Sequence, residues 1–271
     1  MKRSFFATPY ALWMLLFTIF PIIFVAFYAF NDENWSGLES LIRCFEGTNL
    51  RILWRSIKLA IESTFLCLIL GYPTAYFLAS KDFSKYKTLF VLILLPMWMN
   101  FLLRTYATMS LLENQGIINT VLEKLGLERR ELIGTEGAVL FGMVYNYLPF
   151  MVLPIHTCLK KMDQRVIEAA EDLGANPIRV FFRVTLPLSV SGIISGITMV
   201  FMPSVTTFAV SRLLGSGNFM LLGDLIEKQF MELNAWSFGS ALSLFMMVII
   251  LLSIRLLNRL DTDKSERSNN W

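Results

Sequence analysis

The sequence predicts an all-α polytopic membrane protein with six transmembrane helices. Of its 271 residues, 55% are hydrophobic and only 17% are charged, whereas an average globular chain carries about 25% charged residues. Six stretches contain no charged residue at all: 4–30, 63–80, 88–103, 137–159, 184–211 and 233–254. Five of them reach 18 residues, a length typical of a membrane span. This pattern excludes a soluble enzyme, a disordered chain and a disulfide scaffold.

The first span needs to be distinguished from a signal peptide, because Lys2 and Arg3 precede it. The apolar run from Pro9 to Phe30 would be about 33 Å long as a helix, whereas the apolar region of a signal peptide has about 7–15 residues. The run ends at Phe30-Asn31 rather than at a pair of small residues that a signal peptidase would cleave. We therefore expect a retained transmembrane helix at 9–30.

The other five spans follow from the remaining apolar runs. We expect helices at 56–80, 88–112, 137–160, 188–212 and 237–258. Arg104 interrupts the third span, and a buried arginine is costly unless it faces protein or water. The chain then divides into an N-terminal helix with its outer loop (1–55), a five-helix transmembrane domain (56–258) and a cytoplasmic tail (259–271).

The distribution of lysine and arginine predicts the orientation. Six spans place both termini on one side, and the segments of that side hold 14 of the 24 basic residues. Short cytoplasmic loops are enriched in lysine and arginine. We therefore expect a protein of the bacterial cell membrane with both termini on the cytoplasmic side. The strongest local signals are Lys81, Lys85 and Lys87 in one loop and Lys160, Lys161 and Arg165 in another.

The chain contains no motif for nucleotide or metal chemistry. There is no phosphate-binding loop of the form GxxxxGK[ST] and no HExxH, and three cysteines with a single histidine, His156, make no metal site. The net charge is only +3 and no basic patch with aromatics occurs, which argues against nucleic acid. We expect no cofactor in this chain, so either an ion gradient or another subunit supplies the energy.

The loop after the fourth span, about 160–187, predicts two short helices. Asp163 is a good N-cap, and Gly174 suits a residue with positive φ at the end of the first helix. Asn176 can cap a second helix that starts at Pro177 and ends near Leu186-Pro187. Two small residues, Ala169 and Ala170, allow close approach of a partner, with Glu168, Glu171 and Asp172 as charges beside them. A docking surface and a solvated linker both remain open from these residues alone.

This loop resembles the EAA motif of permease subunits of ABC importers. The matching residues are Glu168-Ala169-Ala170, then Gly174, then Leu186-Pro187, with Val184 where the family usually has isoleucine. The resemblance implies a type I (MetI-like) permease fold and a coupling helix that docks on a separate ATPase subunit. It assigns ATPase coupling to the following residues of this chain: Glu168, Ala169, Ala170, Asp172, Gly174 and Pro187.

The likeness extends over about residues 10–258 and is similar to the PotB-type branch of spermidine/putrescine importers. It is carried by Gly71–Ala79, by Leu95–Asn100 with Leu103–Tyr106, and by Tyr147–Pro154. It implies a second homologous permease, a dimer of ATPase subunits that bind ATP and Mg, and an extracytoplasmic binding protein. Related branches carry oxyanions, ferric iron or thiamine. A secondary transporter is the alternative of another class, although no repeat and no acid at mid-depth supports it.

Polar and aromatic residues suggest where a solute would pass. We expect the pathway to border Trp98, Asn100, Arg104 and Tyr106 of the third span and Phe208 and Ser211 of the fifth, although lipid contact or packing remains open for each aromatic. Outer carboxylates that could attract a polycation are Glu62, Glu113 and Asp224. Arg104 and Arg212 would repel such a solute. That conflict disappears if Arg104 pairs with Glu62 or Glu113, if Arg212 lies at the membrane surface, or if a partner permease supplies carboxylates.

Overall fold

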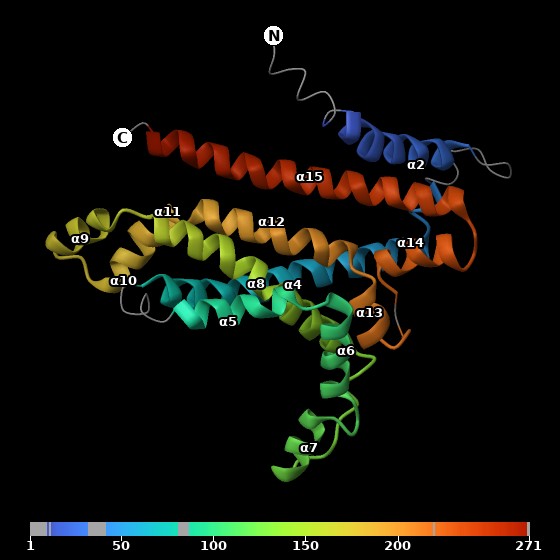
Figure 1. The fold of residues 1–271 in the computed structure, drawn as a ribbon, viewed down its shortest axis with the longest axis horizontal. Helices are drawn as coiled ribbons and strands as arrows, with labels where there is room; N and C mark the ends of the chain where they lie inside the picture. Colours follow the sequence, from blue (N-terminus) through green and yellow to red (C-terminus); the bar gives the residue numbers. More distant parts are fainter. Residues whose placement is uncertain (1–9, 11, 32–41, 81–86, 219, 270–271) are drawn as a thin grey trace.

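Every regular element in the described part of the chain is a helix. The structure is a computed structural model that describes residues 10, 12–31, 42–80, 87–218 and 220–269. The long helices run side by side as a bundle (Figure 1). They are α2 (Phe20–Phe30, preceded by a π-turn at Leu15–Ile19), α4 (Gly47–Ala79), α5 (Lys87–Trp98), α8 (Glu136–Lys161), α12 (Val190–Thr206) and α15 (Trp236–Asn269).

Short helices gather at the two ends of this bundle. At one end lie α9 (Gln164–Asp172) and the helical segment formed by α10 (Pro177–Val180), a π-turn (Phe181–Thr185) and α11 (Leu186–Leu188). At the other end lie α6 (Phe101–Leu112), α7 (Ile117–Lys124), α13 (Ala209–Leu214) and α14 (Leu222–Met231). The described end of α15 lies on the same side as α9.

The centre of the bundle is formed by α4, α8 and α12, which pack closely because glycines meet a methionine between them. A side chain at Gly71 would come within 2.9 Å of Met151, and one at Gly196 within 2.6 Å of the Met151 sulfur. Small residues at such interfaces let transmembrane helices approach each other. Hydroxyl groups add bonds between the helices: Ser63 to Ser204 at 3.1 Å and Tyr72 to Ser189 at 2.9 Å.

The first and last helices lie outside this centre and pack on each other. Tyr28 of α2 and Trp236 of α15 place their rings 6.2 Å apart. Only 6% of the apolar window in α2 and 17% of that in α15 are buried, against 56% for α8. The exposed faces of α2 and α15 are therefore available to lipid or to another subunit.

The six predicted spans are all present as helical segments, with corrected boundaries. Three helices are long and apolar enough to cross a membrane by themselves (Leu12–Phe30, Glu136–Lys161 and Trp236–Leu257), and two bent pairs raise the number to five. The remaining predicted span corresponds to α4, which lies along α8 but is not among these candidate spans. It starts nine residues before the predicted 56–80 because ion pairs stabilise its polar first turns, for example Arg55 with Glu136 at 3.2 Å.

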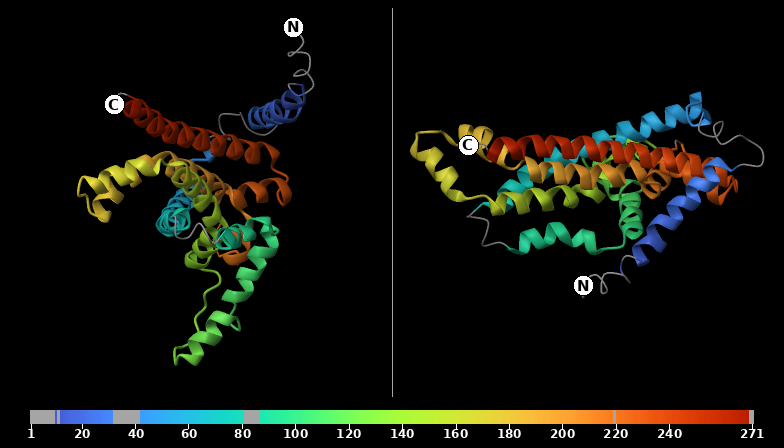
Figure 2. Two further views of the ribbon diagram at one scale, coloured as in Figure 1. Left: turned by 60° about the vertical axis from the view of Figure 1, so that its left-hand side comes forward. Right: turned by 90° about the horizontal axis from the view of Figure 1, so that it is seen from above.

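The prediction of one continuous third helix at 88–112 is wrong. The chain bends by 99° between Trp98 and Phe101, so that α6 and then α7 project sideways from the bundle (Figure 2). Asn100 causes the break, because its side chain accepts hydrogen bonds from the backbone N–H groups of Leu102 and Leu103 and so starts a new helix.

The predicted fifth helix at 188–212 is interrupted at both ends. It bends by 62° between Leu188 and Val190 and stops at Thr206, and α13 follows as a separate helix. Pro203 weakens the last turn because it lacks an N–H donor, and Tyr147 of α8 donates a hydrogen bond to the Pro203 carbonyl at 3.3 Å. The tail predicted from 259 onwards continues α15 as a helix to Asn269.

Candidate translocation pathway and coupling loop

The loop between α8 and α12 folds as the two short helices that the sequence predicts. The Asp163 side chain accepts a hydrogen bond from the Arg165 N–H at 3.0 Å and starts α9. Gly174 has φ +80°, a conformation that favours glycine, and it ends α9. The Asn176 side chain then accepts from the Arg179 N–H at 2.8 Å and starts α10.

Helix α9 contributes no buried side chain to the protein. Glu168, Ala169, Asp172, Gly174 and Pro187 are exposed, and Ala170 is partly exposed. Leu173, next to Gly174, exposes 89% of its surface, although it is apolar and lies at the end of the bundle.

A cavity of about 240 Å³ separates α9 from the ends of α4 and α8. Its walls include Tyr76 and Ser80 of α4, Met162, Ile167 of α9, and Thr185 of the π-turn. Because α9 rests over a space rather than on a packed core, it can move relative to the bundle with little loss of contact.

Near the other end of the bundle, Arg104 is buried rather than open to a cavity. Only 4% of its surface is exposed, and its Nη1 donates to the Pro96 carbonyl at 2.8 Å. Neither Glu62 nor Glu113 pairs with it: Glu62 lies 3.8 Å from Lys58, and Glu113 is exposed at the end of α6. The guanidinium group therefore holds α6 against the end of α5, where backbone carbonyls carry partial negative charge.

The other predicted pathway residues lie in different surroundings. Trp98, Asn100 and Tyr106 are exposed, Trp98 to 84%. Phe208 is 45% exposed at the break after α12, whereas Ser211 is fully buried and donates to the Phe208 carbonyl at 2.9 Å. The structure thus brings Phe208 and Ser211 together, whereas Asn100 is exposed and Arg104 is buried.

The carboxylates at this end are bound within the protein to different degrees. Asp224 accepts a hydrogen bond from the Leu221 N–H at 2.8 Å, and burial raises the pKa of this carboxyl group. Arg212 forms an ion pair of 2.7 Å with Glu227, and its side chain is largely exposed. The positive charge of Arg212 is thereby offset by a carboxylate at this end of the bundle.

Further buried polar atoms surround the two helix breaks, and those of Asn146 and Thr207 were not predicted from the sequence. Asn146 of α8 donates to the Gly142 carbonyl at 2.8 Å and to Thr105 of α6 at 3.4 Å. The side-chain oxygens of Asn146 and Thr207, and Nε of Arg104, are buried without a partner in the described part of the chain. A polar residue inside an apolar run was the available signal, since such residues face protein or water.

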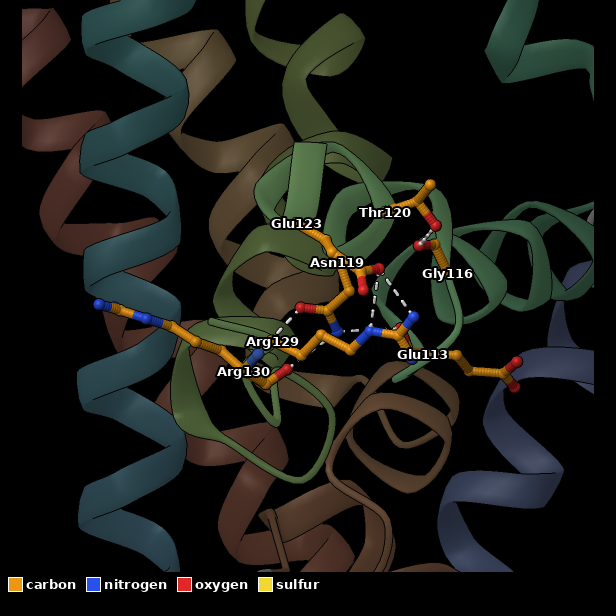
Figure 3. Close-up of polar contacts among 7 residues, drawn as sticks. All are labelled: Glu113, Gly116, Asn119, Thr120, Glu123, Arg129 and Arg130. Atoms are coloured by element: carbon orange, nitrogen blue, oxygen red, sulfur yellow. Dashed lines mark hydrogen bonds and ion pairs between the residues drawn. The ribbon is translucent and has the colours of Figure 1, made fainter. Parts of the chain in front are cut away.

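The loop from α6 to α8 is ordered by Asn119, as Figure 3 shows. Its amide nitrogen donates to the Glu113 and Arg130 carbonyls at 3.2 and 3.0 Å, and its oxygen accepts from the Arg130 N–H at 3.0 Å. Arg129 pairs with Glu123 at 2.8 Å. These bonds close the segment into a defined arm that extends from the end of the bundle.

Comparisons with known proteins agree with this arrangement. The family model "Binding-protein-dependent transport system inner membrane component" matches residues 4–265. The chain is 37% identical over 264 residues to the spermidine/putrescine transport system permease protein PotB of Haemophilus influenzae, with 91% of this chain and 92% of that protein covered. It is 34% identical to the protein of the same name from Escherichia coli (strain K12), with 91% and 96% covered.

The fold also matches a solved structure. A subunit of a bacterial ABC transporter involved in the import of the acidic polysaccharide alginate superimposes with a TM-score of 0.78 at 18% identity, and the match covers 97% of this chain and 96% of that one. The expected permease fold is therefore confirmed, and the likeness at this low identity concerns the fold alone.

Proposed function

The chain belongs to the family of binding-protein-dependent transport system inner membrane components, and from that premise we propose that it forms half of a pathway for polyamines. Its place as a permease subunit of an ABC importer follows from the family and the fold. The identity of the solute is inferred from the relatives and from the charged residues near the pathway.

Relatives with similar sequences support a polyamine as the solute, and the charges of Arg104 and Arg212 do not oppose this assignment. PotB proteins are described as permeases for spermidine and putrescine. The two cations that would repel a polycation are both occupied: Arg104 is buried against the Pro96 carbonyl, and Arg212 is paired with Glu227. The burial of Arg104 and the ion pair of Arg212 are the observations on which the assignment depends, because an open arginine in the pathway would favour an anion.

The same proposal assigns the partners. A separate ATPase dimer, which binds ATP and Mg, docks on α9 at Glu168, Ala169, Ala170, Asp172, Gly174 and Pro187, and a second homologous permease completes the pathway. An extracytoplasmic binding protein delivers the solute to the end that carries α6, α7 and α13. Both termini then lie in the cytoplasm. Lys81 and Lys85, which contribute to this orientation, lie outside the described residues.

At the outer end, Trp98, Asn100, Tyr106 and Phe208 border the entrance in this proposal. Arg104 and Ser211 support it from within the protein. Glu62, Glu113 and Asp224 attract a cation, since carboxylates favour ammonium groups and exposed aromatic rings attract cations through their faces.

The test is transport by the reconstituted complex. Vesicles containing both permeases and the ATPase, supplied with binding protein and ATP, should accumulate labelled spermidine, and unlabelled putrescine should compete. Sulfate, molybdate, ferric iron and thiamine should not compete. Uptake that continues without ATP but stops when the proton or sodium gradient is collapsed would identify a secondary transporter instead.

A further inference from the structure

A groove of about 460 Å³ runs between α8 and α12 in the half of the bundle near α9. Its lining is unusual for a membrane-spanning surface because it contains hydroxyl, thiol and amine groups. The polar members and one apolar neighbour are Thr157, Cys158, Lys161, Ser191, Ser195 and Met199. None of them was expected to belong to the pathway.

Other spans show what a lipid-facing surface of this protein looks like. Between residues 89 and 95 of α5 the exposed side chains are Leu89, Val91, Leu92 and Leu95. In the middle of α15 they are Val248, Leu251 and Leu252. Every one of these is apolar.

The corresponding stretch of α12 differs sharply. Between residues 191 and 199 its exposed side chains are Ser191, Ser195 and Met199. Polar side chains in a span face protein or water rather than hydrocarbon. The α8–α12 face therefore differs in polarity from these exposed faces of α5 and α15.

Two hydroxyl groups of the groove, those of Ser195 and Thr157, are left as acceptors. The Ser195 hydroxyl donates a hydrogen bond to the Ser191 carbonyl at 2.8 Å, and the Thr157 hydroxyl donates one to the Leu153 carbonyl at 2.8 Å. A hydroxyl group has one donor and two lone pairs. Because the donor is already used, these oxygens can only accept a hydrogen bond from a bound solute. An ammonium group, which has donors and no acceptor, suits such a surface, and an oxyanion does not.

We propose that this groove is the inner part of the translocation path, where its hydroxyl oxygens accept hydrogen bonds from the ammonium groups of a solute on its way to the cytoplasm. The proposal rests on the polyamine function proposed above. Lys161 lies at the end of the groove near α9, and its positive charge repels the ammonium groups of the solute there. The groove therefore releases the solute rather than storing it.

The geometry of α12 connects this groove with the outer end. At about 100° per residue, Ser195, Met199 and Thr206 lie within about 40° of one another around the helix. The same face thus leads from the groove to the break at Thr207 and the exposed Phe208. A single wall of the path can run along α12.

The alternative occupant is a helix of the second permease. Ser191 and Ser195 are four residues apart, and small residues at this spacing also allow tight helix packing in membranes. The two alternatives predict opposite reactivity for the thiol of Cys158, whose sulfur lies 3.5 Å from the Ser191 hydroxyl. A water-filled groove leaves this thiol reactive, and a packed helix covers it.

The native cysteine provides the first test in the complete transporter. A charged, membrane-impermeant methanethiosulfonate reagent should modify Cys158 at least about tenfold faster than a cysteine introduced at Leu252 of the lipid-facing surface, because thiolate forms readily only in water. Cys44 and Cys67 are 2% and 0% exposed, and burial raises the pKa of Cys44 to about 11, so neither should react. Cys158→Ser should abolish the labelling, and it serves as the background for Leu252→Cys.

Spermidine delivered by its binding protein during ATP hydrolysis should slow the labelling. An unreactive Cys158, or one that reacts no faster than the lipid-facing cysteine, would overturn the proposal in favour of the packed helix.

The second test removes acceptors without changing size. Thr157→Val combined with Ser191→Ala and Ser195→Ala should reduce spermidine uptake about three- to tenfold, while ATP hydrolysis stimulated by the binding protein persists. Thr198→Val is the matched control, because Thr198 lies on α12 outside the groove and bonds only the Ile194 carbonyl at 2.9 Å. Equal uptake by the triple variant and the control refutes the role of the groove. An absence of spermidine uptake in the unmodified complex refutes the polyamine function instead.

Discussion

Arg104 shows how one side chain can maintain a bend in a membrane helix. Its guanidinium group is buried and donates to the Pro96 carbonyl at 2.8 Å, and it lies 6.0 Å from the Phe101 ring. Both partners flank the 99° bend. The charge therefore serves the shape of the third span, whether or not a solute passes nearby.

Replacing Arg104 by alanine should lower the free energy of unfolding by about 1–3 kcal/mol, the usual effect of losing a charge-assisted bond to a buried acceptor. Thermal unfolding of the purified complex measures this loss. Arg104→Glu should abolish uptake, and Glu62→Arg should not restore it, because Glu62 lies beside Lys58. Rescue by Glu62→Arg would show that the two residues do pair during transport.

Gly174 offers a test at the coupling loop that separates backbone shape from side-chain chemistry. Its φ of +80° is strained for a β-branched residue, whereas asparagine tolerates it. Gly174→Val should distort the end of α9 and uncouple ATP hydrolysis from uptake, and Gly174→Asn should retain most coupling. Both rates are measured on the same vesicles. Equal behaviour of the two variants would exclude a backbone requirement.

At the scale of the element, α9 is a helix that its own protein leaves uncovered. It has no buried side chain, and a cavity of about 240 Å³ lies beneath it. Such a helix gains its stability from a partner. The proposed ATPase would therefore both order α9 and move it.

Ala170 probes that contact directly. Ala170→Asp introduces a charge and extra volume where a partner approaches, so it should reduce coupled uptake at least about tenfold while the protein still inserts. Ala170→Ser, which stays small, is the matched control. The measurements are co-purification of the ATPase and uptake per ATP hydrolysed. Normal coupling with aspartate would remove α9 from the docking surface.

The break between α5 and α6 depends on a cap. Asn100→Ala removes the acceptor of two backbone N–H groups and should cost about 1 kcal/mol of stability. Asn100→Asp, which keeps the acceptor, should cost much less. Thermal unfolding of the two variants side by side decides the point: if alanine is as stable as aspartate, the bend has another cause.

The accuracy of the sequence predictions differs between elements for physical reasons. The fourth helix, predicted at 137–160, is observed at Glu136–Lys161, because charges bound its apolar run on both sides. The bend at Asn100 was missed, since one asparagine in an apolar run fits either a polar face or a cap. The groove residues were missed because the exposure of Ser191 and Ser195 depends on which helices pack beside α12.

At the scale of the whole molecule, the bundle has two distinct ends. One carries α9 and the described end of α15, and the other carries α6, α7 and α13. The proposed orientation places the first end in the cytoplasm. The basic residues at the end of α8 favour it by the positive-inside rule.

Cysteine labelling in intact cells and inverted vesicles tests this orientation. A cysteine at Glu171 of α9 should react only from the cytoplasm, and one at Glu128 in the arm only from outside. Both side chains are exposed, so that access to water does not limit the comparison. Ser84, in a loop of the same predicted side as α9, lies outside the described residues. Labelling in the opposite sense would reverse the whole assignment.

The contact between α2 and α15 has a consequence for biosynthesis. Tyr28 meets Trp236, which the ribosome adds roughly 200 residues later, or about 10–40 s at ordinary rates of elongation. Throughout that interval the first helix lacks α15, the helix that it packs against in the described part of the chain, and must reside in the bilayer without it. Its mean hydropathy of 2.3 over Leu12–Phe30 keeps it stable in the bilayer during this interval. Polar substitutions that the finished bundle would accept can therefore still be lost at the insertion step, before any packing exists to compensate for them.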